Sequence, residues 1–134
     1  MPLPYEHAQR VIVGAHQKAR EMGVRVTVAV VDEGGALQAL GRMDGAPSLS
    51  SQIAEAKAVG AAVWHREGAS LLELQTSRPA FFDAVSRLVR LPVMPGLGSV
   101  LIRNQDAVLG AVGVSGATSE QDLECARAGL GELA

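Results

Sequence analysis

The sequence predicts an α+β fold in which a mainly antiparallel sheet is covered by helices. Segments with strand periodicity come in two adjacent pairs, each joined by a short turn, and helix-like segments flank both pairs. Adjacent pairs favour hairpins over strand-helix-strand crossovers, and hairpins build antiparallel sheets. The length of 134 residues, with 48% apolar side chains, suits one compact domain over residues 1–134.

The amino-terminal third predicts a helix followed by a hairpin. Apolar residues recur at helical spacing over residues 4–22, and Gly23 is suited to the helix end. Residues 24–31 alternate with the period of a strand, and residues 36–43 return as a second strand. The tetrapeptide 32–35, Asp-Glu-Gly-Gly, is a turn whose glycines can take positive φ.

The middle of the chain predicts helices. A helix over residues 48–65 begins at a cluster of serines (48, 50 and 51), any of which could cap it, and Gly68 ends it. Residues 69–91 read as two short helices broken at Pro79, because proline disfavours a helical residue before it.

The carboxyl-terminal part predicts a second hairpin and a last helix. A loop rich in proline and glycine leads from residue 92 into a strand that ends at 102, and residues 103–106 form a turn. The glycine-rich segment 107–116 is the last strand, and Thr118 with Gln121 has the spacing of a capping box for the final helix.

Composition excludes several classes of function. The net charge is −2 and no basic stripe is visible, so nucleic acid is not an expected partner. No apolar run reaches 18 residues, so we expect no membrane span. Cys125 is the single cysteine, and the first ten residues lack the order of a secretion signal, so we expect the cytoplasm.

The histidines and glycines give weak signals. His7 and His16 fall on opposite sides of one helix and His65 stands alone, so we predict no metal site held by protein ligands. Gly96-Leu97-Gly98 lacks the third glycine of a dinucleotide-binding fingerprint and leads into a strand. Ser115 lies in an imperfect nucleophile elbow, so we interpret it as a strand-end or ligand-contacting residue.

Lys57 is the most informative charged residue. Its helical neighbours three and four positions away are all apolar, so it points from a non-polar face. Either it lies along that face with its ammonium group in water, or it faces a cavity and is paired with a carboxylate or an anionic ligand.

Two further segments are candidate ligand contacts. Arg42 and Asp44 close the second strand, where they form a structural ion pair or Arg42 binds a carboxylate of a ligand. Met94 and Gly96 lie in a loop whose backbone a flat ligand could approach.

The assembled motifs resemble the GlcG/HbpS-like family of haem-binding and haem-degrading proteins, and also the carboxyl-terminal part of PduO-type corrinoid adenosyltransferases. The resemblance rests on "VAVVDEGGALQALGRMDGA" (28–46), "AEAKAVGAA" (54–62), "VLGAVGVSGATSEQD" (108–122) and "CARAGL" (125–130). The recurrent positions that this chain shares with the family are Asp32, Gly35, Arg42, Met43, Asp44, Gly45, Lys57, Pro95, Gly96, Gly110, Gly113, Ser115, Gly116 and Asp122. Leu97 departs from the usual Pro-Gly-Gly of the loop, which alters the wall of any pocket there.

The resemblance implies a profilin-like α+β domain, assembly into homo-oligomers and, in some members, binding of haem or related tetrapyrroles. Our first hypothesis is therefore a cytoplasmic protein that binds haem or a related carboxylate ligand in an apolar pocket near an oligomer interface. The predicted ligand contacts are Lys57, Arg42, Asp44, Met94, Gly96 and Ser115. Met43, Met94, His7 and His65 are possible haem ligands, although no pair has diagnostic spacing.

Two alternatives stay open. One is an enzyme that acts on a small carboxylate or carbonyl metabolite, with Lys57 as base or nucleophile, because desolvation lowers a lysine pKa and frees the amine. The other is a structural or regulatory oligomer without a ligand.

Overall fold

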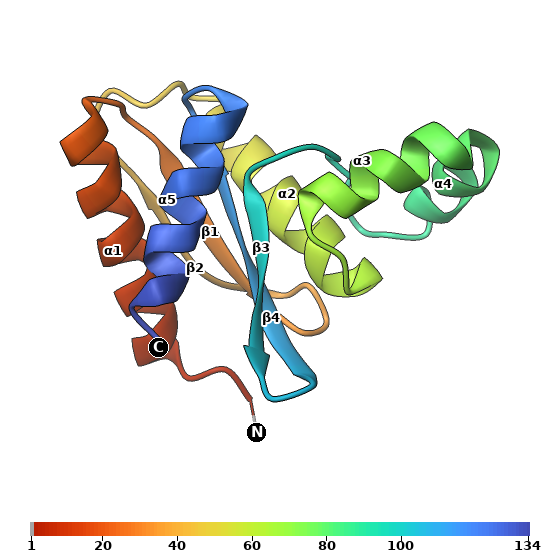
Figure 1. Ribbon diagram of the computed structural model, residues 1–134, viewed down its shortest axis with the longest axis horizontal. Helices are drawn as coiled ribbons and strands as arrows, with labels where there is room; N and C mark the ends of the chain where they lie inside the picture. Colours follow the sequence, from red (N-terminus) through yellow and green to blue (C-terminus); the bar gives the residue numbers. More distant parts are fainter. Residues whose placement is uncertain (1) are drawn as a thin grey trace.

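A computed structural model describes residues 2–134 and consists of a four-stranded antiparallel sheet flanked by helices (Figure 1). The elements in chain order are α1 (Tyr5–Met22), β1 (Thr27–Asp32), β2 (Leu37–Arg42), α2 (Ser50–Trp64), α3 (Gly68–Ser77), α4 (Pro79–Ser86), β3 (Ser99–Asn104), β4 (Ala107–Ser115) and α5 (Ser119–Gly131). The strand order is β2-β1-β4-β3, and every neighbouring pair is antiparallel. The predicted α+β class is confirmed.

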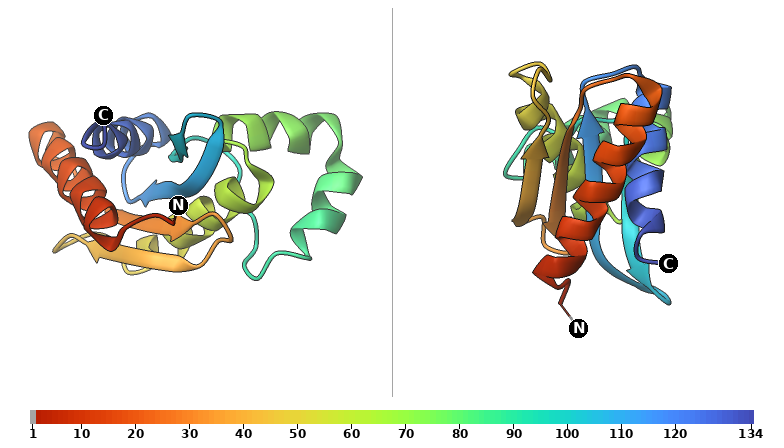
Figure 2. Two further views of the ribbon diagram at one scale, coloured as in Figure 1. Left: turned by 90° about the horizontal axis from the view of Figure 1, so that it is seen from below. Right: turned by 90° about the vertical axis from the view of Figure 1, so that its left-hand side faces the viewer.

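Helices cover both faces of the sheet. Figures 1 and 2 show α1 and α5 side by side on one face and α2 on the other. Val28 and Val30 of β1 belong to the apolar core under α1 and α5, whereas Ala29 and Val31 belong to the core under α2. The alternation in the sequence thus separates two cores, and β1 is buried on both sides.

The turn between β1 and β2 forms as predicted. The Asp32 carboxylate accepts hydrogen bonds from the N–H groups of Gly34 and Ala36, each at 2.9 Å, and Gly35 has a φ of +84°. An Asx-type turn of this kind explains the choice of Asp-Glu-Gly-Gly between two strands.

Helices α3 and α4 form an arm that extends away from the sheet (Figures 1 and 2). The predicted break at Pro79 is confirmed, since Arg78 ends α3 and precedes α4. The arm has a small apolar cluster of its own, made of Leu71, Leu74, Phe82 and Val93. Among residues 2–134, no helix is long and apolar enough to cross a membrane.

Two local predictions, the helix end at Gly68 and the serine cap, are wrong because a tertiary contact decides each position. Gly68 does not end a helix but begins α3, where its carbonyl accepts a hydrogen bond from Gly96. The helix before it ends at Trp64, followed by His65 with a φ of +54°. No serine caps α2, because Leu49 is its N-cap and Ser50 turns inward to bond the hydroxyl of Thr27 at 2.7 Å.

The predicted strand bounds also need correction. The first strand begins at Thr27 rather than at residue 24, because the N–H of Val24 is still bonded to the carbonyl of Ala19 at the end of α1. Strand β3 continues to Asn104, so the second hairpin turn is tighter than residues 103–106.

Candidate functional site

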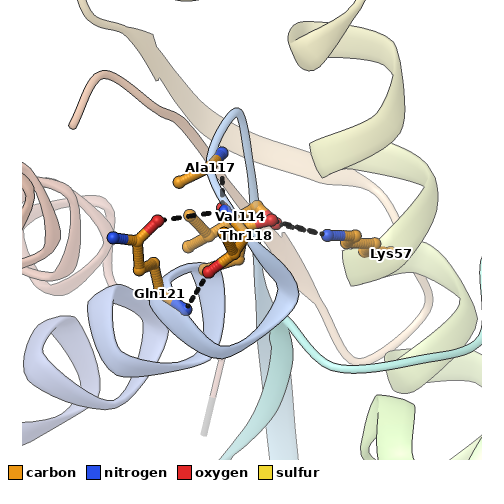
Figure 3. A network of polar contacts seen from close by, with 6 residues as sticks. Lys57, Val114, Ala117, Thr118 and Gln121 are labelled. Carbon is orange, nitrogen blue, oxygen red and sulfur yellow. Dashed lines mark hydrogen bonds and ion pairs between the residues drawn. The ribbon is translucent and has the colours of Figure 1, made fainter.

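Lys57 and Asp122 form a buried ion pair between α2 and α5. The Lys57 Nζ atom lies 3.2 Å from Asp122 Oδ2, and the two side chains are only 10% and 4% exposed. Lys57 also donates a hydrogen bond of 2.8 Å to the carbonyl of Val114 at the end of β4 (Figure 3). Of the two alternatives for Lys57, the structure therefore shows the ammonium inside the protein and paired with a carboxylate.

The start of α5 positions Asp122. Thr118 caps the helix by accepting a hydrogen bond from the N–H of Gln121, and the Gln121 side chain accepts one from the N–H of Thr118 (Figure 3). This capping box confirms the prediction and places Asp122 in the first turn, where the positive end of the helix dipole favours a carboxylate. The second oxygen of Asp122 accepts a hydrogen bond from the N–H of Ala117 at 3.0 Å.

The electrostatics of the pair follow from burial. Burial raises the pKa of the Asp122 carboxyl above its ordinary 3.8, while the Lys57 ammonium and the Ala117 N–H work in the opposite direction. Gly98 closes over the pair, because a Cβ atom there would lie 2.7 Å from the Lys57 Nζ atom. The arrangement satisfies both charges internally and joins α2, β4 and α5.

A basic hollow of about 570 Å³ lies where the end of α1 meets the end of β2. We use this name for the space lined by His16, Arg20, Gly23, Val24, Arg25, Arg42, Met43 and Asp44. Arg42 donates hydrogen bonds of 3.2 and 3.1 Å from Nε and Nη2 to the carbonyl of Ala46, and Arg25 donates one of 2.7 Å to the carbonyl of Asp44.

An apolar groove of about 580 Å³ runs along the outer strand β3 beside both ends of the chain. Its walls are Pro2, Leu3, Pro4, Leu101, Ile102, Leu109, Leu130, Leu133 and Ala134. Three polar side chains also line it: His7 from the first turn of α1, and Arg103 and Asn104 from the end of β3.

The structure separates the residues predicted to contact a ligand. Arg42 and Asp44 line the basic hollow. Within the described part of the chain, however, no ion pair joins them, and Arg42 secures the corner through the Ala46 carbonyl instead. Lys57 and Ser115 are buried, with relative exposures of 8% and 7%, and line neither space.

Met94 and Gly96 lie half-buried in the loop between α4 and β3, and they too line neither space. The histidines are equally dispersed, since His7 lines the groove, His16 the hollow, and His65 is exposed. Over residues 2–134, no three His, Cys, Asp or Glu side chains come together as a potential metal site.

Sequence reasoning missed several residues. Asp122 was visible as a family position and as part of the first turn of the last helix, but nothing marked it as the partner of Lys57. Arg20, Arg25 and Arg103 gave no signal, because isolated arginines in a sequence are usually exposed.

Comparison with known proteins gives consistent results. A family model described as haem degrading protein HbpS-like matches residues 3–131. Protein GlcG of Escherichia coli strain K12 is 34% identical over 115 residues, which cover 84% of this chain and 81% of GlcG. The corrinoid adenosyltransferase PduO of Citrobacter freundii is 27% identical over 133 residues, which are 99% of this chain but only 39% of that enzyme.

Solved structures share the fold. The crystal structure of a double mutant of Streptomyces reticuli HbpS has a TM-score of 0.89 and 28% identity, covering 100% of this chain and 88% of HbpS. A complex of PduOC with haem has a TM-score of 0.88 and 24% identity, covering 98% of this chain and 95% of PduOC, which shows a common fold. With nearly the whole sequence matched and the resemblance of its motifs confirmed, this chain belongs to the HbpS-like family.

Proposed function

We propose that this chain binds haem, or a related tetrapyrrole with carboxylate groups, in the apolar groove beside β3. The description of the family as haem degrading and the haem complex of PduOC support the choice of ligand. The observation that carries the proposal for this chain is that apolar walls, an imidazole and a guanidinium line one space.

The groove has the chemistry that haem requires. Leu109, Leu130 and Leu133 are half-buried and offer an apolar surface to a flat ring. The volume of about 580 Å³ lies within the range of about 300–1,000 Å³ of small-molecule sites. Iron in haem proteins is commonly held by histidine, and arginine binds carboxylates with two parallel hydrogen bonds.

The residues then take distinct roles. The half-buried imidazole of His7 is the candidate iron ligand, and Arg103, which is exposed, is the candidate partner of a propionate. The leucine and isoleucine walls exclude water from the ring. Haem, when bound, supplies a redox-active iron. This proposal differs from the contact set expected from the sequence, because Lys57 is satisfied by Asp122 and is not available to a ligand.

Titration of the purified protein with haemin tests the proposal. We expect a saturable, red-shifted Soret band with one haemin per chain, and we expect His7→Ala to abolish the shift. His65→Asn is the matched control, because the exposed His65 does not line the groove, although it lines a neighbouring space with Leu101 and Arg103, and asparagine tolerates its left-handed backbone. A Soret band that never saturates, or that serum albumin reproduces equally well, would overturn haem binding. Equal loss in both variants would refute the role of His7.

Assembly and location remain predictions of the sequence. Exposed apolar side chains on and beside the α3–α4 arm support self-association, with Leu72 46%, Phe81 43% and Leu88 84% exposed. We propose a homo-oligomer, and light scattering coupled to gel filtration measures its mass. A monomer at micromolar concentration would contradict it. The predicted cytoplasmic location is tested by fractionating the native host.

A further inference from the structure

Three arginines from separate segments converge on the basic hollow. Arg20 comes from the last turn of α1, Arg25 from the segment that follows it, and Arg42 from the end of β2. All three are exposed. Like charges gathered in one space add up to a positive potential that favours an anion.

Within the described residues, no carboxylate forms an ion pair with any of these three groups. The ion pairs among residues 2–134 are Lys18 with Glu21, Lys57 with Asp122, Arg87 with Asp83, and Arg90 with Glu55. Asp44 is the only acidic residue that lines the hollow, and it bonds Arg25 through its backbone carbonyl. The hollow therefore carries a local excess of positive charge on a chain whose net charge is −2.

Structural roles explain the arginines singly but not together. Arg20 lies in the last turn of α1, where the helix dipole favours a cation. Arg42 fastens the corner after β2 by its bonds to Ala46, and Arg25 holds the carbonyl of Asp44. None of these roles requires the three groups to line one space, and each leaves guanidinium donors unused, since a guanidinium has five N–H groups.

We propose that the basic hollow binds a small polyanion, a molecule with two or more phosphate or carboxylate groups. Planar guanidinium groups bind both kinds of group with paired hydrogen bonds, and three of them suit at least two anionic groups. The volume of about 570 Å³ admits a small metabolite. Apart from Val24 and Met43 the lining is polar or glycine, so the hollow suits a hydrophilic ligand rather than the ring of a tetrapyrrole.

This site is separate from the proposed haem groove. The hollow lies at the end of α1 that contains Arg20, whereas the groove begins at His7 near the start of the same 18-residue helix. The two spaces share no lining residue. Failure of either proposal therefore leaves the other unaffected. A variant in one site should change binding at that site and leave binding at the other site unchanged.

Calorimetric titration with inorganic pyrophosphate and, separately, with citrate tests the proposal on the intact chain. Arg20→Gln is the test variant, because the Arg20 side chain makes no hydrogen bond or ion pair with other described residues, so its loss should leave the fold intact. Arg127→Gln is the matched control, since it removes the same charge from an exposed position on α5. Binding of pyrophosphate alone indicates a phosphate ligand, and binding of citrate alone a polycarboxylate.

We expect saturable binding of at least one of the two anions with one site per chain. Arg20→Gln should weaken it about ten-fold or more, as expected for the loss of a charge-assisted hydrogen bond, and Arg127→Gln should change it less than about two-fold. In nitrogen-15 correlation spectra, the anion should shift the signals of residues 20–25 and 41–46. His7→Ala should leave anion binding unchanged.

Three results would overturn the proposal. The first is the absence of saturable heat with both anions at low ionic strength. The second is an equal effect of the Arg20 and Arg127 variants, which would indicate only a long-range field. The third is a set of spectral shifts spread over the whole surface, which would indicate non-specific ion association.

Discussion

Replacing Lys57 by methionine should destabilise the protein strongly. The Asp122 side chain is only 4% exposed, and the change removes the ammonium group that pairs with its carboxylate. It also removes the hydrogen-bond donor to the carbonyl of Val114. Removing one partner of a buried ion pair costs about 3–5 kcal/mol. Against a total stability of about 5–15 kcal/mol, that loss brings a domain of this size close to unfolding. At about 4 °C per kcal/mol, Tm should fall by about 12–20 °C.

Urea denaturation followed by circular dichroism measures this loss in a double-mutant cycle. Asp122→Leu alone should also be costly, because it leaves the ammonium of Lys57 buried and unpaired, but the double variant should be no worse than either single variant. Lys18→Met is the matched control, because the pair of Lys18 with Glu21 is exposed and should contribute less than about 1 kcal/mol. A cost below about 1 kcal/mol for Lys57→Met, or strict additivity in the cycle, would refute the reasoning.

Three further predictions concern the same region. The pKa of Asp122 is raised in the folded state, so the folded protein binds this proton more tightly than the unfolded chain does. The contribution of Asp122 to the free energy of unfolding therefore increases as the pH falls from the folded-state pKa to the ordinary value of 3.8. Asp122→Asn has no such titrating group. The free energy of unfolding of the wild type, relative to that of Asp122→Asn, should therefore increase as the pH falls. Urea denaturation at several pH values measures this difference, and a constant difference would contradict the prediction. Burial raises the pKa of the Cys125 thiol to about 11, so an aromatic disulfide reagent at pH 8 should react slowly with the folded protein and quickly in urea; similar rates would show that the thiol is accessible. Gly98→Ala should cost about 2 kcal/mol or more, because φ is +119° and the new Cβ would lie 2.7 Å from Lys57 Nζ; an unchanged Tm would show that the loop relaxes freely.

Local sequence signals predicted most of the fold. The capping box at Thr118, the break at Pro79 and the turn at Asp32 depend on residues within five positions of each other, so a sequence reveals them directly. The roles of Gly68 and Ser50 could not be predicted, for the opposite reason. Gly68 packs under the loop at Gly96 and Ser50 bonds Thr27, and these contacts join segments that are far apart in the chain.

The candidate sites could be predicted only in part. The apolar neighbours of Lys57 indicated a buried cation, but its partner is 65 positions away, and no periodicity relates the two. The groove brings His7 and Arg103 together, and the hollow brings Arg20 and Arg42 together, only because α1 packs on β1 and β2 beside α5, so that its first turn lies at the groove and its last turn at the hollow. Arg42 and Asp44 carried a usable signal, because they close a strand beside a glycine corner, and His7 was a possible haem ligand by residue type alone.

The contrast between Lys57 and the arginines shows which charges are available for recognition. A buried ammonium group needs a partner within the protein, because burying an unpaired charge strongly destabilises the folded state. Asp122 is that partner. Exposed guanidinium groups are under no such requirement, so they keep donors free at little cost in stability. The apolar surroundings that made Lys57 prominent in the sequence are therefore the reason that it stabilises the fold. The arginines near the ends of α1 and β2, which were inconspicuous in the sequence, are the groups available to bind an anionic ligand.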